Sequence, residues 1–172
     1  MTIPSNEKNE NYTPVNILKV VKEFFEVIHL DPFSSDLANK SVGAQAYFTE
    51  ETNGLTTDWN DFGALIDPLP NIWINPPYSR KLIGKCIDKT LEYTTFAEVL
   101  LLVNSETTSK WYQKCLERKP LMLLPDKRMK FINPYNAHKS SANKPQTMFY
   151  FGFRKLAFRQ QFGHLGSICQ PL

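Results

Sequence analysis

Cysteine, glycine and long apolar runs are scarce in this chain of 172 residues. Its three cysteines, Cys86, Cys115 and Cys169, are an odd number without close pairing, which argues against a disulfide framework and a cysteine-based zinc site. The three histidines also lack the mutual spacing of metal ligands, so we predict no metal. No apolar run approaches the roughly 18 residues that spanning a bilayer requires, and no signal-peptide pattern opens the chain. These absences favour a cytoplasmic protein without a membrane segment.

Acidic residues are scarce in the C-terminal part of the chain. Through Ser109 there are 15 acidic and 8 basic residues, whereas from Lys110 onward there are 2 acidic and 12 basic residues. A basic segment with interleaved aromatic residues suits a polyanion, because Lys and Arg that contact phosphates release counterions. A solvated basic face would explain the same composition, so charge alone leaves both interpretations open.

The length of the chain suits one domain and leaves no room for a second catalytic domain. Residues 1–11 are polar and aperiodic, so we expect a flexible tail there and a single domain over 12–172. Within that domain, the polar stretch at 132–147 is long for a loop in a compact fold, which suggests a function in recognition. Inside this stretch, Asn133-Pro134-Tyr135 lacks a buried strand before it and is interpreted as a turn.

Apolar spacing predicts alternating helices and strands. Helices are expected from Ser34 over a short stretch and at 14–28, 80–93 and 105–117, with Thr13 as the cap of the helix at 14–28. Strands are expected just before Asp31 and at 44–49, 71–74, 97–103, 121–124, 148–153 and 156–162. This order predicts an α/β fold with a doubly wound, mostly parallel sheet, helices on both faces and antiparallel strands at the C-terminal end.

The sequence Asn75-Pro76-Pro77-Tyr78 directly follows the predicted buried strand at 71–74. Sheets of this class bind ligands at the carboxyl ends of their strands, so a catalytic loop is expected at this position. The two prolines stiffen the loop, while the Asn75 side chain and the Pro76 backbone each offer a carbonyl oxygen. Such a pair can hold both hydrogens of a planar amine on a base and turn its lone pair toward an electrophile. Tyr78 offers an aromatic face for that base, and a rigid surface turn is the alternative explanation of the motif.

Together with its flanks, this motif resembles one enzyme family. The sequence NPPY after an apolar strand resembles motif IV of S-adenosylmethionine-dependent amino-methyltransferases. The spacing of the other segments resembles that of small phage-type DNA N6-adenine methyltransferases: the segment leading into the helix at 14–28, Asp31-Pro32-Phe33-Ser34-Ser35 through Asn39, Tyr47-Phe48-Thr49, Asn53-Gly54-Leu55, Asp58-Trp59, and the stretches at 100–112 and 124–131. The similarity covers about residues 12–165. It implies a Rossmann-like class I methyltransferase fold and S-adenosylmethionine as the cofactor.

The resemblance also implies the cofactor contacts. It places Thr13 near the methionine carboxylate, Asp31 and Ser34 at the methionine end, Thr49 or Glu50 near the ribose, and Asn53 and Leu55 beside the adenine ring, with Asp58 as a further contact. The acidic balance of this part of the chain agrees with a cationic ligand. Asp31 could instead cap a helix or an Asx turn, and Asp58 could merely cap a turn.

One departure from the family pattern concerns the turn after the first strand. The usual glycine-rich turn is absent, because Phe33, Ser34 and Ser35 occupy its place. We therefore expect the tail of the cofactor to bind in a non-standard way or weakly.

Basic residues near the motif and the long loop are the candidates for nucleic-acid binding. They are Arg80, Lys81, Lys127, Arg128, Lys130, Lys139 and Lys144. We therefore predict an enzyme that transfers a methyl group from S-adenosylmethionine to the N6 amine of adenine in DNA, in duplex DNA with the target adenine flipped out, by direct displacement. The oligomeric state is left open. The alternatives are RNA or a protein glutamine as the acceptor, or a nucleic-acid-binding module that lacks catalysis.

Overall fold

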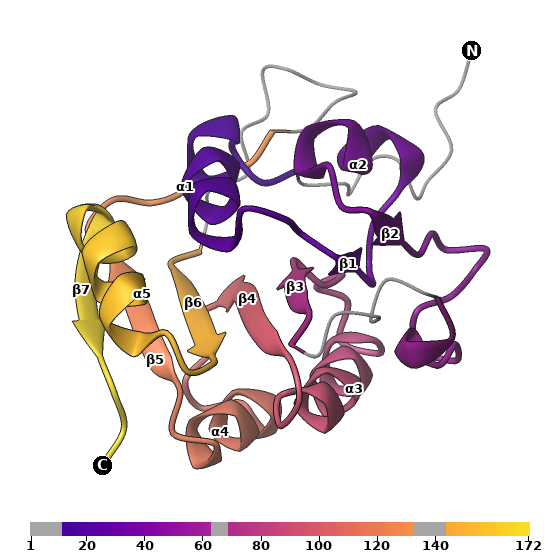
Figure 1. Ribbon diagram of the computed structural model, residues 1–172. Helices are drawn as coiled ribbons and strands as arrows, with labels where there is room; N and C mark the ends of the chain where they lie inside the picture. The colour runs from indigo at the N-terminus through magenta and orange to yellow at the C-terminus, as the bar shows by residue number, and fades with distance from the viewer. Residues whose placement is uncertain (1–11, 63–68, 133–143) are drawn as a thin grey trace.

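The computed structural model describes residues 12–62, 69–132 and 144–172, which form a mixed α/β fold around one sheet (Figure 1). The described strands are β1 (Leu30–Asp31), β2 (Ala46–Tyr47), β3 (Asn71–Ile74), β4 (Glu98–Asn104), β5 (Leu121–Pro125), β6 (Gln146–Phe151) and β7 (Gly166–Cys169). The α-helices of the same ranges are α1 (Val15–Phe25), α2 (Asp36–Val42), α3 (Ile83–Tyr93), α4 (Lys110–Glu117) and α5 (Lys155–Phe162). Short 3₁₀ helices cover η2 (Trp59–Phe62) and η3 (Gly163–Leu165).

The seven strands lie in the order β2-β1-β3-β4-β6-β5-β7. The strands β2, β1, β3 and β4 are parallel neighbours, whereas β6 runs antiparallel to both β4 and β5. It follows that β1 to β5 all point the same way and that their carboxyl ends, with the start of β6, lie at one edge of the sheet. We call this edge the carboxyl edge. An antiparallel C-terminal end of the sheet is confirmed, but of the two strands predicted there only the one at 148–153 is present, as β6; the other antiparallel strand is β7.

Helices cover both faces of this sheet, as Figure 1 shows. Because side chains alternate along a strand, Leu100 and Leu102 of β4 join the core beneath α1 and α5, whereas Leu101 and Val103 join the core beneath α3 and α4. The two cores together bury both surfaces of β3, β4 and β6. The central strands therefore form a rigid base for the loops that leave the carboxyl edge.

The first helix is shorter than predicted, and Thr13 does not cap it. The Pro14 carbonyl accepts the first helical hydrogen bonds, from the N–H groups of Ile17 and Leu18, so α1 begins at Val15. The helix ends at Phe25 because Glu26 takes a left-handed conformation, with φ of 62°. The Thr13 hydroxyl instead accepts a hydrogen bond from the Asn75 side chain.

At the C-terminal end, one predicted strand was wrong and one strand was missed. The segment 156–162 is not a strand but the main part of α5, because Phe158 and Phe162 are four residues apart and lie on one face of a helix. Their rings stack on each other with centroids 4.7 Å apart, and Phe158 also stacks on Tyr150 of β6. The last strand of the sheet, β7, follows at Gly166–Cys169 and was not predicted.

The helix predicted at 105–117 begins only at Lys110. Residues Ser105 to Ser109 form a turn, in which the Ser109 N–H and hydroxyl both donate to the Glu106 carbonyl. The Ser109 hydroxyl then caps α4 by accepting a hydrogen bond from the Tyr112 N–H. Several side chains of this turn consequently face the carboxyl edge instead of lying on a helix.

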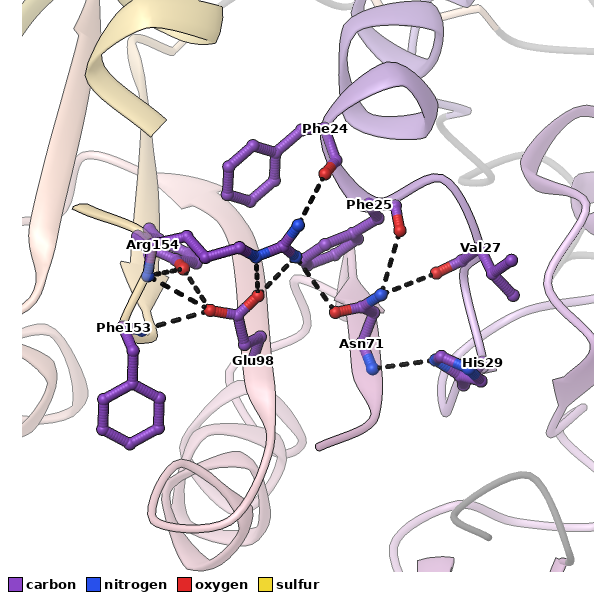
Figure 2. A network of polar contacts seen from close by, with 9 residues as sticks. Phe24, Phe25, Val27, His29, Asn71, Glu98, Phe153 and Arg154 are labelled. Carbon is purple, nitrogen blue, oxygen red and sulfur yellow. Dashed lines mark hydrogen bonds and ion pairs between the residues drawn. The ribbon is translucent and has the colours of Figure 1, made fainter. Parts of the chain in front are cut away.

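A buried polar network ties the opposite edge of the sheet together (Figure 2). Glu98, at the start of β4, is only 1% exposed and forms an ion pair with Arg154. The guanidinium of Arg154 also donates to the Phe24 carbonyl, 3.0 Å away, and to the side-chain oxygen of Asn71, 3.2 Å away. The side-chain nitrogen of Asn71 in turn donates to the Phe25 carbonyl. The network thus connects the end of α1, the starts of β3 and β4, and the corner before α5.

Candidate active site

The carboxyl edge gathers most of the predicted functional residues. Asp31 ends β1 and Ser34 follows it, Thr49, Glu50, Asn53 and Leu55 follow β2, the Asn75–Tyr78 motif follows β3, Lys127, Arg128 and Lys130 follow β5, and Lys144 precedes β6. These residues come from segments far apart in the sequence. The parallel order of β1 to β5 brings them to the same edge.

Asp31 and Asn75 lie at a point where the direction of the chain path changes. The strands β1 and β3 are neighbours, with Leu30 opposite Ile72. From β1 the chain passes through α2 to β2 on one side, whereas from β3 it passes through α3 to β4 on the other side. In α/β sheets, such a switch point leaves a crevice at the carboxyl ends of the two strands, and ligands bind there.

The side-chain amide of Asn75 is held in one orientation. Its nitrogen donates to the Thr13 hydroxyl oxygen at 3.2 Å, and its oxygen accepts a hydrogen bond from the Tyr78 hydroxyl at 3.0 Å. Because Thr13 is buried, with 5% of its surface exposed, this contact is shielded from water.

The hydroxyl of Tyr78 also lies 3.1 Å from the carbonyl oxygen of Leu102 on β4. Burial raises the pKa of this phenol well above its usual range, so the hydroxyl remains neutral and acts as a donor. The ring is half-buried against the core beneath α3 and α4. Within the motif, Pro76 is buried and Pro77 is exposed.

The Asp31 carboxyl is buried, with 3% of its surface exposed. Burial raises its pKa to about 7, although the hydrogen bond from the Phe33 N–H and the nearby Ser34 hydroxyl oppose this shift. The Phe33 contact, 3.3 Å long, is the Asx-turn contact that the alternative interpretation of Asp31 expects. Among the residues that the structure describes, Asp31 forms no ion pair. The buried Ser34 hydroxyl beside it has no well-aligned hydrogen-bond partner there either.

The loop after β2 packs closely on the turn after β1. The Ser34 N–H donates to the Phe48 carbonyl, and a Cβ atom added to Gly54 would lie 2.0 Å from the Pro32 carbonyl oxygen. Only glycine permits this approach. Thr49 and Asn53 use their side chains within the loop itself: the Thr49 hydroxyl lies 3.4 Å from that of Thr52, and the Asn53 oxygen accepts from the Leu55 N–H.

Asp58 is the predicted cofactor residue that the structure places apart from the others. Its carboxylate accepts hydrogen bonds from the Asn60 N–H and from the hydroxyl of Tyr93, at the end of α3 and hence away from the carboxyl edge. These hydrogen bonds hold the pKa of Asp58 below its usual range. The contacts are those of the turn cap that was the alternative for this residue.

A groove of about 710 Å³ runs along the carboxyl edge beside Tyr78. Its walls come from the motif, the start of α3, the turn after β4 and the residues before β6, and include Tyr78, Arg80, Glu106, Trp111 and Lys144. Sequence reasoning missed Glu106 because it placed this residue inside a helix, although its position directly after the strand at 97–103 was the available signal. It missed Trp111, which does lie in the first turn of α4, because no local pattern shows that this ring faces the carboxyl edge.

The remaining basic candidates are exposed. Lys127, Arg128 and Lys130 lie on the surface, whereas Met129 and Phe131 between and after them are buried in the core. Arg80 lines the groove and Lys81 is exposed beside it. Lys139, the Asn133-Pro134-Tyr135 turn and most of the loop at 132–147 lie outside the described residues.

Covalent catalysis by Cys86 or Cys115 has no support in this structure. Both thiols are buried, and burial raises the pKa of each to about 12, so they stay protonated. Over the described ranges, no cluster of three or more histidine, cysteine or carboxylate side chains is placed to hold a metal ion. No described helix is long and apolar enough to cross a membrane.

Comparison with known proteins agrees with this geometry. Residues 1–167 match the protein family described as DNA N-6-adenine-methyltransferase (Dam). The chain belongs to the Dam family. It is also 26% identical to the DNA N-6-adenine-methyltransferase of Haemophilus phage HP1 (strain HP1c1), over 144 residues that cover 81% of this chain and 76% of the relative.

Membership of the Dam family confirms the resemblance stated from the motifs and the expected methylation of adenine N6 in DNA. The chain is a DNA adenine-N6 methyltransferase, and DNA is its substrate. The individual roles of the residues at the carboxyl edge remain predictions.

Proposed function

We propose that this enzyme binds S-adenosylmethionine at the carboxyl ends of β1 and β2 and methylates an adenine that is flipped out of DNA and held at Asn75. The observation that carries the proposal is the fixed Thr13–Asn75–Tyr78 chain of hydrogen bonds at a switch point, one strand away from the buried carboxyl of Asp31. With the strand order and the helices on both faces, this supports a doubly wound, Rossmann-like class I methyltransferase fold in a single domain.

The residues after β1 fit the methionine end of the cofactor. Among the described residues, the buried Asp31 carboxylate has no cationic partner and the buried Ser34 hydroxyl has no well-aligned partner, which costs free energy unless a ligand satisfies both groups. An ammonium group satisfies both, so Asp31 and Ser34 would hold it. When bound, the cofactor supplies a methyl group made electrophilic by a sulfonium. Thr49, Glu50, Asn53 and Leu55 on the adjoining loop would contact its ribose and adenine.

The role of Asn75 is to hold the target amine. The Asn75 side-chain oxygen, which the Tyr78 hydroxyl orients, would accept one hydrogen of the amine, while the Pro76 carbonyl would accept the other. Positive charge develops on the amine nitrogen during methyl transfer, and acceptors placed beforehand stabilise that charge. Thr13 keeps the amide from rotating, because its hydroxyl accepts the hydrogen bond of the Asn75 nitrogen.

The groove beside Tyr78 is where the target base would enter. Stacking of a base on an aromatic ring is worth about 1–3 kcal/mol, comparable to the few kcal/mol needed to unstack it from a duplex. Arg80 and Lys81 follow the motif and would contact phosphates beside the target. Lys127, Arg128 and Lys130, which precede the loop at 132–147, and Lys139 and Lys144, which belong to it, would also contact the DNA.

The test is methyl transfer with S-adenosylmethionine that carries a labelled methyl group. Duplex DNA, RNA and a glutamine-containing peptide are offered separately, and labelled DNA is digested to nucleosides. We expect N6-methyldeoxyadenosine as the labelled product. Label that appears in RNA or the peptide but not in DNA would overturn the proposal, as would the absence of any calorimetric heat with the cofactor.

A further inference from the structure

The groove at the carboxyl edge is longer than a single flipped base requires. Asn75 follows β3, whereas Lys144 precedes β6, and β6 lies two strands from β3. Two strand spacings amount to about 10 Å, so the far end of the groove lies beyond a base held at Asn75. The volume of the groove, about 710 Å³, also exceeds what one base needs, because pockets of roughly 300–1,000 Å³ hold ligands larger than a nucleobase.

The far end presents one aromatic ring. Trp111, in the first turn of α4, lines the groove and is half-buried. Its ring contacts that of Tyr112 at 5.7 Å between centroids. The Tyr112 hydroxyl lies 2.7 Å from the hydroxyl of Thr147 on β6, which in turn lies 2.8 Å from that of Ser105. Trp111 therefore lies on a helix that the Tyr112–Thr147 contact holds against β6.

The same end carries an ion pair that an anion could rearrange. The ammonium of Lys144 lies 2.6 Å from the carboxylate of Glu106, and both residues line the groove. Their segments are neighbours, because the Ser105 N–H donates to the Pro145 carbonyl. Both side chains are partly exposed, so the pair contributes little stability by itself. A phosphate that reaches Lys144 would take the place of Glu106 and would meet Arg80 further along the same groove.

We propose that the far end of this groove binds the nucleotide next to the target adenine, with its base stacked on Trp111 and its phosphate on Lys144. The inference rests on the proposed function in that the bound strand is DNA carrying a target at Asn75. Stacking tolerates any base, because every base has a π face. This subsite is therefore expected to bind without regard to the identity of the neighbouring base.

The chain contains three tryptophans, which makes the subsite measurable. Trp59 and Trp73 are fully buried, so a change of tryptophan fluorescence on binding of DNA reports on Trp111. We expect single-stranded oligothymidylate, which contains no adenine, to quench the fluorescence of the wild-type enzyme. In Trp111→Leu the quenching should vanish, and the affinity for oligothymidylate measured by anisotropy should fall by at least about fivefold. Circular dichroism and thermal melting check that the variant is folded.

A second variant tests the ion pair. Glu106→Gln releases Lys144 and is expected to tighten oligothymidylate binding about two- to fivefold. The matched control is Asp88→Asn, which breaks a similar exposed pair with Lys114, 2.5 Å long and outside the groove, and should leave the affinity unchanged.

Three results would overturn the inference. Oligothymidylate that binds by anisotropy without quenching the fluorescence would place the strand elsewhere. Quenching by adenine-containing oligonucleotides alone would assign Trp111 to the target base. Wild-type affinity in a fully folded Trp111→Leu variant would show that stacking on Trp111 does not contribute to binding. None of these readouts needs methyl transfer, so a failure of the proposed function is recognised separately, by the absence of labelled product.

Discussion

The side-chain nitrogen of Asn75 donates a hydrogen bond to the hydroxyl oxygen of Thr13, 3.2 Å away and 62 residues earlier in the chain. The segment that contains Thr13 is itself anchored on both sides. The Tyr12 backbone pairs with that of Ile132 after β5, and the Tyr12 hydroxyl lies 3.2 Å from that of Ser35. The segment thus crosses the carboxyl edge and holds the amide of the motif.

The first prediction follows from this bond. In Thr13→Val the shape is kept but the acceptor is lost, so we expect the single-turnover rate of methyl transfer to fall about five- to tenfold, as for a net hydrogen bond of about 1 kcal/mol. Thr13→Ser restores the hydroxyl and should restore the rate. A wild-type rate in a folded Thr13→Val enzyme would show that Asn75 does not need this partner.

The second prediction concerns the pH dependence of cofactor binding. Because burial raises the pKa of Asp31 to about 7, the carboxyl is largely protonated below that pH and cannot pair with an ammonium group. The affinity for S-adenosylmethionine should therefore weaken by up to about tenfold per pH unit below pH 7. Calorimetry between pH 5.5 and 8 measures it.

Two variants separate this effect from others. Asp31→Asn should bind weakly and lose the pH dependence. Asp36→Asn, which changes an exposed acid in the first turn of α2, should keep it. Equal affinity of the wild-type enzyme at pH 6 and pH 8 would contradict the assignment of Asp31.

The third prediction uses the close packing of Gly54 on Pro32. A Cβ atom at Gly54 would lie 2.0 Å from the Pro32 backbone oxygen, and neither backbone segment can shift without moving the turn that holds Asp31. We expect Gly54→Ala to lower the unfolding free energy by about 2 kcal/mol or more and to weaken cofactor binding. Gly163→Ala is the control, since a Cβ atom there meets no atom within 4 Å. Similar melting temperatures for the two variants would speak against this packing.

The fourth prediction concerns the network in Figure 2. Arg154→Met leaves the Glu98 carboxylate buried without its cation, which typically costs 3–5 kcal/mol. Since the Arg154 side chain is 39% exposed, we expect a loss somewhat below that range, about 2–3 kcal/mol, in urea unfolding. A loss below about 0.5 kcal/mol would indicate that the pair is screened by water.

The ion pair between Glu98 and Arg154 also determines how the stability of the protein changes at acidic pH. Burial by itself would raise the pKa of Glu98, but Arg154, Tyr150 and the Phe153 N–H outweigh it and hold the pKa below its usual value. The stabilisation is therefore present above the unfolded-state pKa, near 4.5, and is lost as the pH falls through the lower folded-state value. Thermal melts from pH 7 to pH 3 should show a smaller loss of stability in Glu98→Gln than in the wild-type protein.

Much of the central fold could be predicted from the sequence because its signals are local. The apolar runs that form β3 and β4 are buried on both sides. The Asn75–Tyr78 motif directly follows the first of these runs. The family, the reaction and the place of Asp31, Ser34 and Asn75 at one edge followed from this alternation and the resemblance. Periodicity also located α1, α3 and α4, with errors only at their ends.

The rest depended on contacts between distant residues. Aromatic residues are common in strands, so the run containing Phe158 and Phe162 was interpreted as one, although packing against Phe24 and Tyr150 favours a helix. Thr13 has the sequence position of a helix cap, yet its hydroxyl accepts a hydrogen bond from the Asn75 side chain instead. Likewise, the hydrogen bond between Asp58 and Tyr93 joins residues 35 positions apart, which no local pattern reveals.

The most direct test of the account is methyl transfer by Asn75→Ala, measured beside cofactor binding and DNA binding by the same variant. We predict that the rate of N6-adenine methylation falls at least about a hundredfold, because one of the two acceptors for the amine is gone, while both affinities stay within about threefold of the wild-type values. An Asn75→Ala enzyme that methylates adenine at the wild-type rate would contradict the central claim that this amide holds the reacting amine.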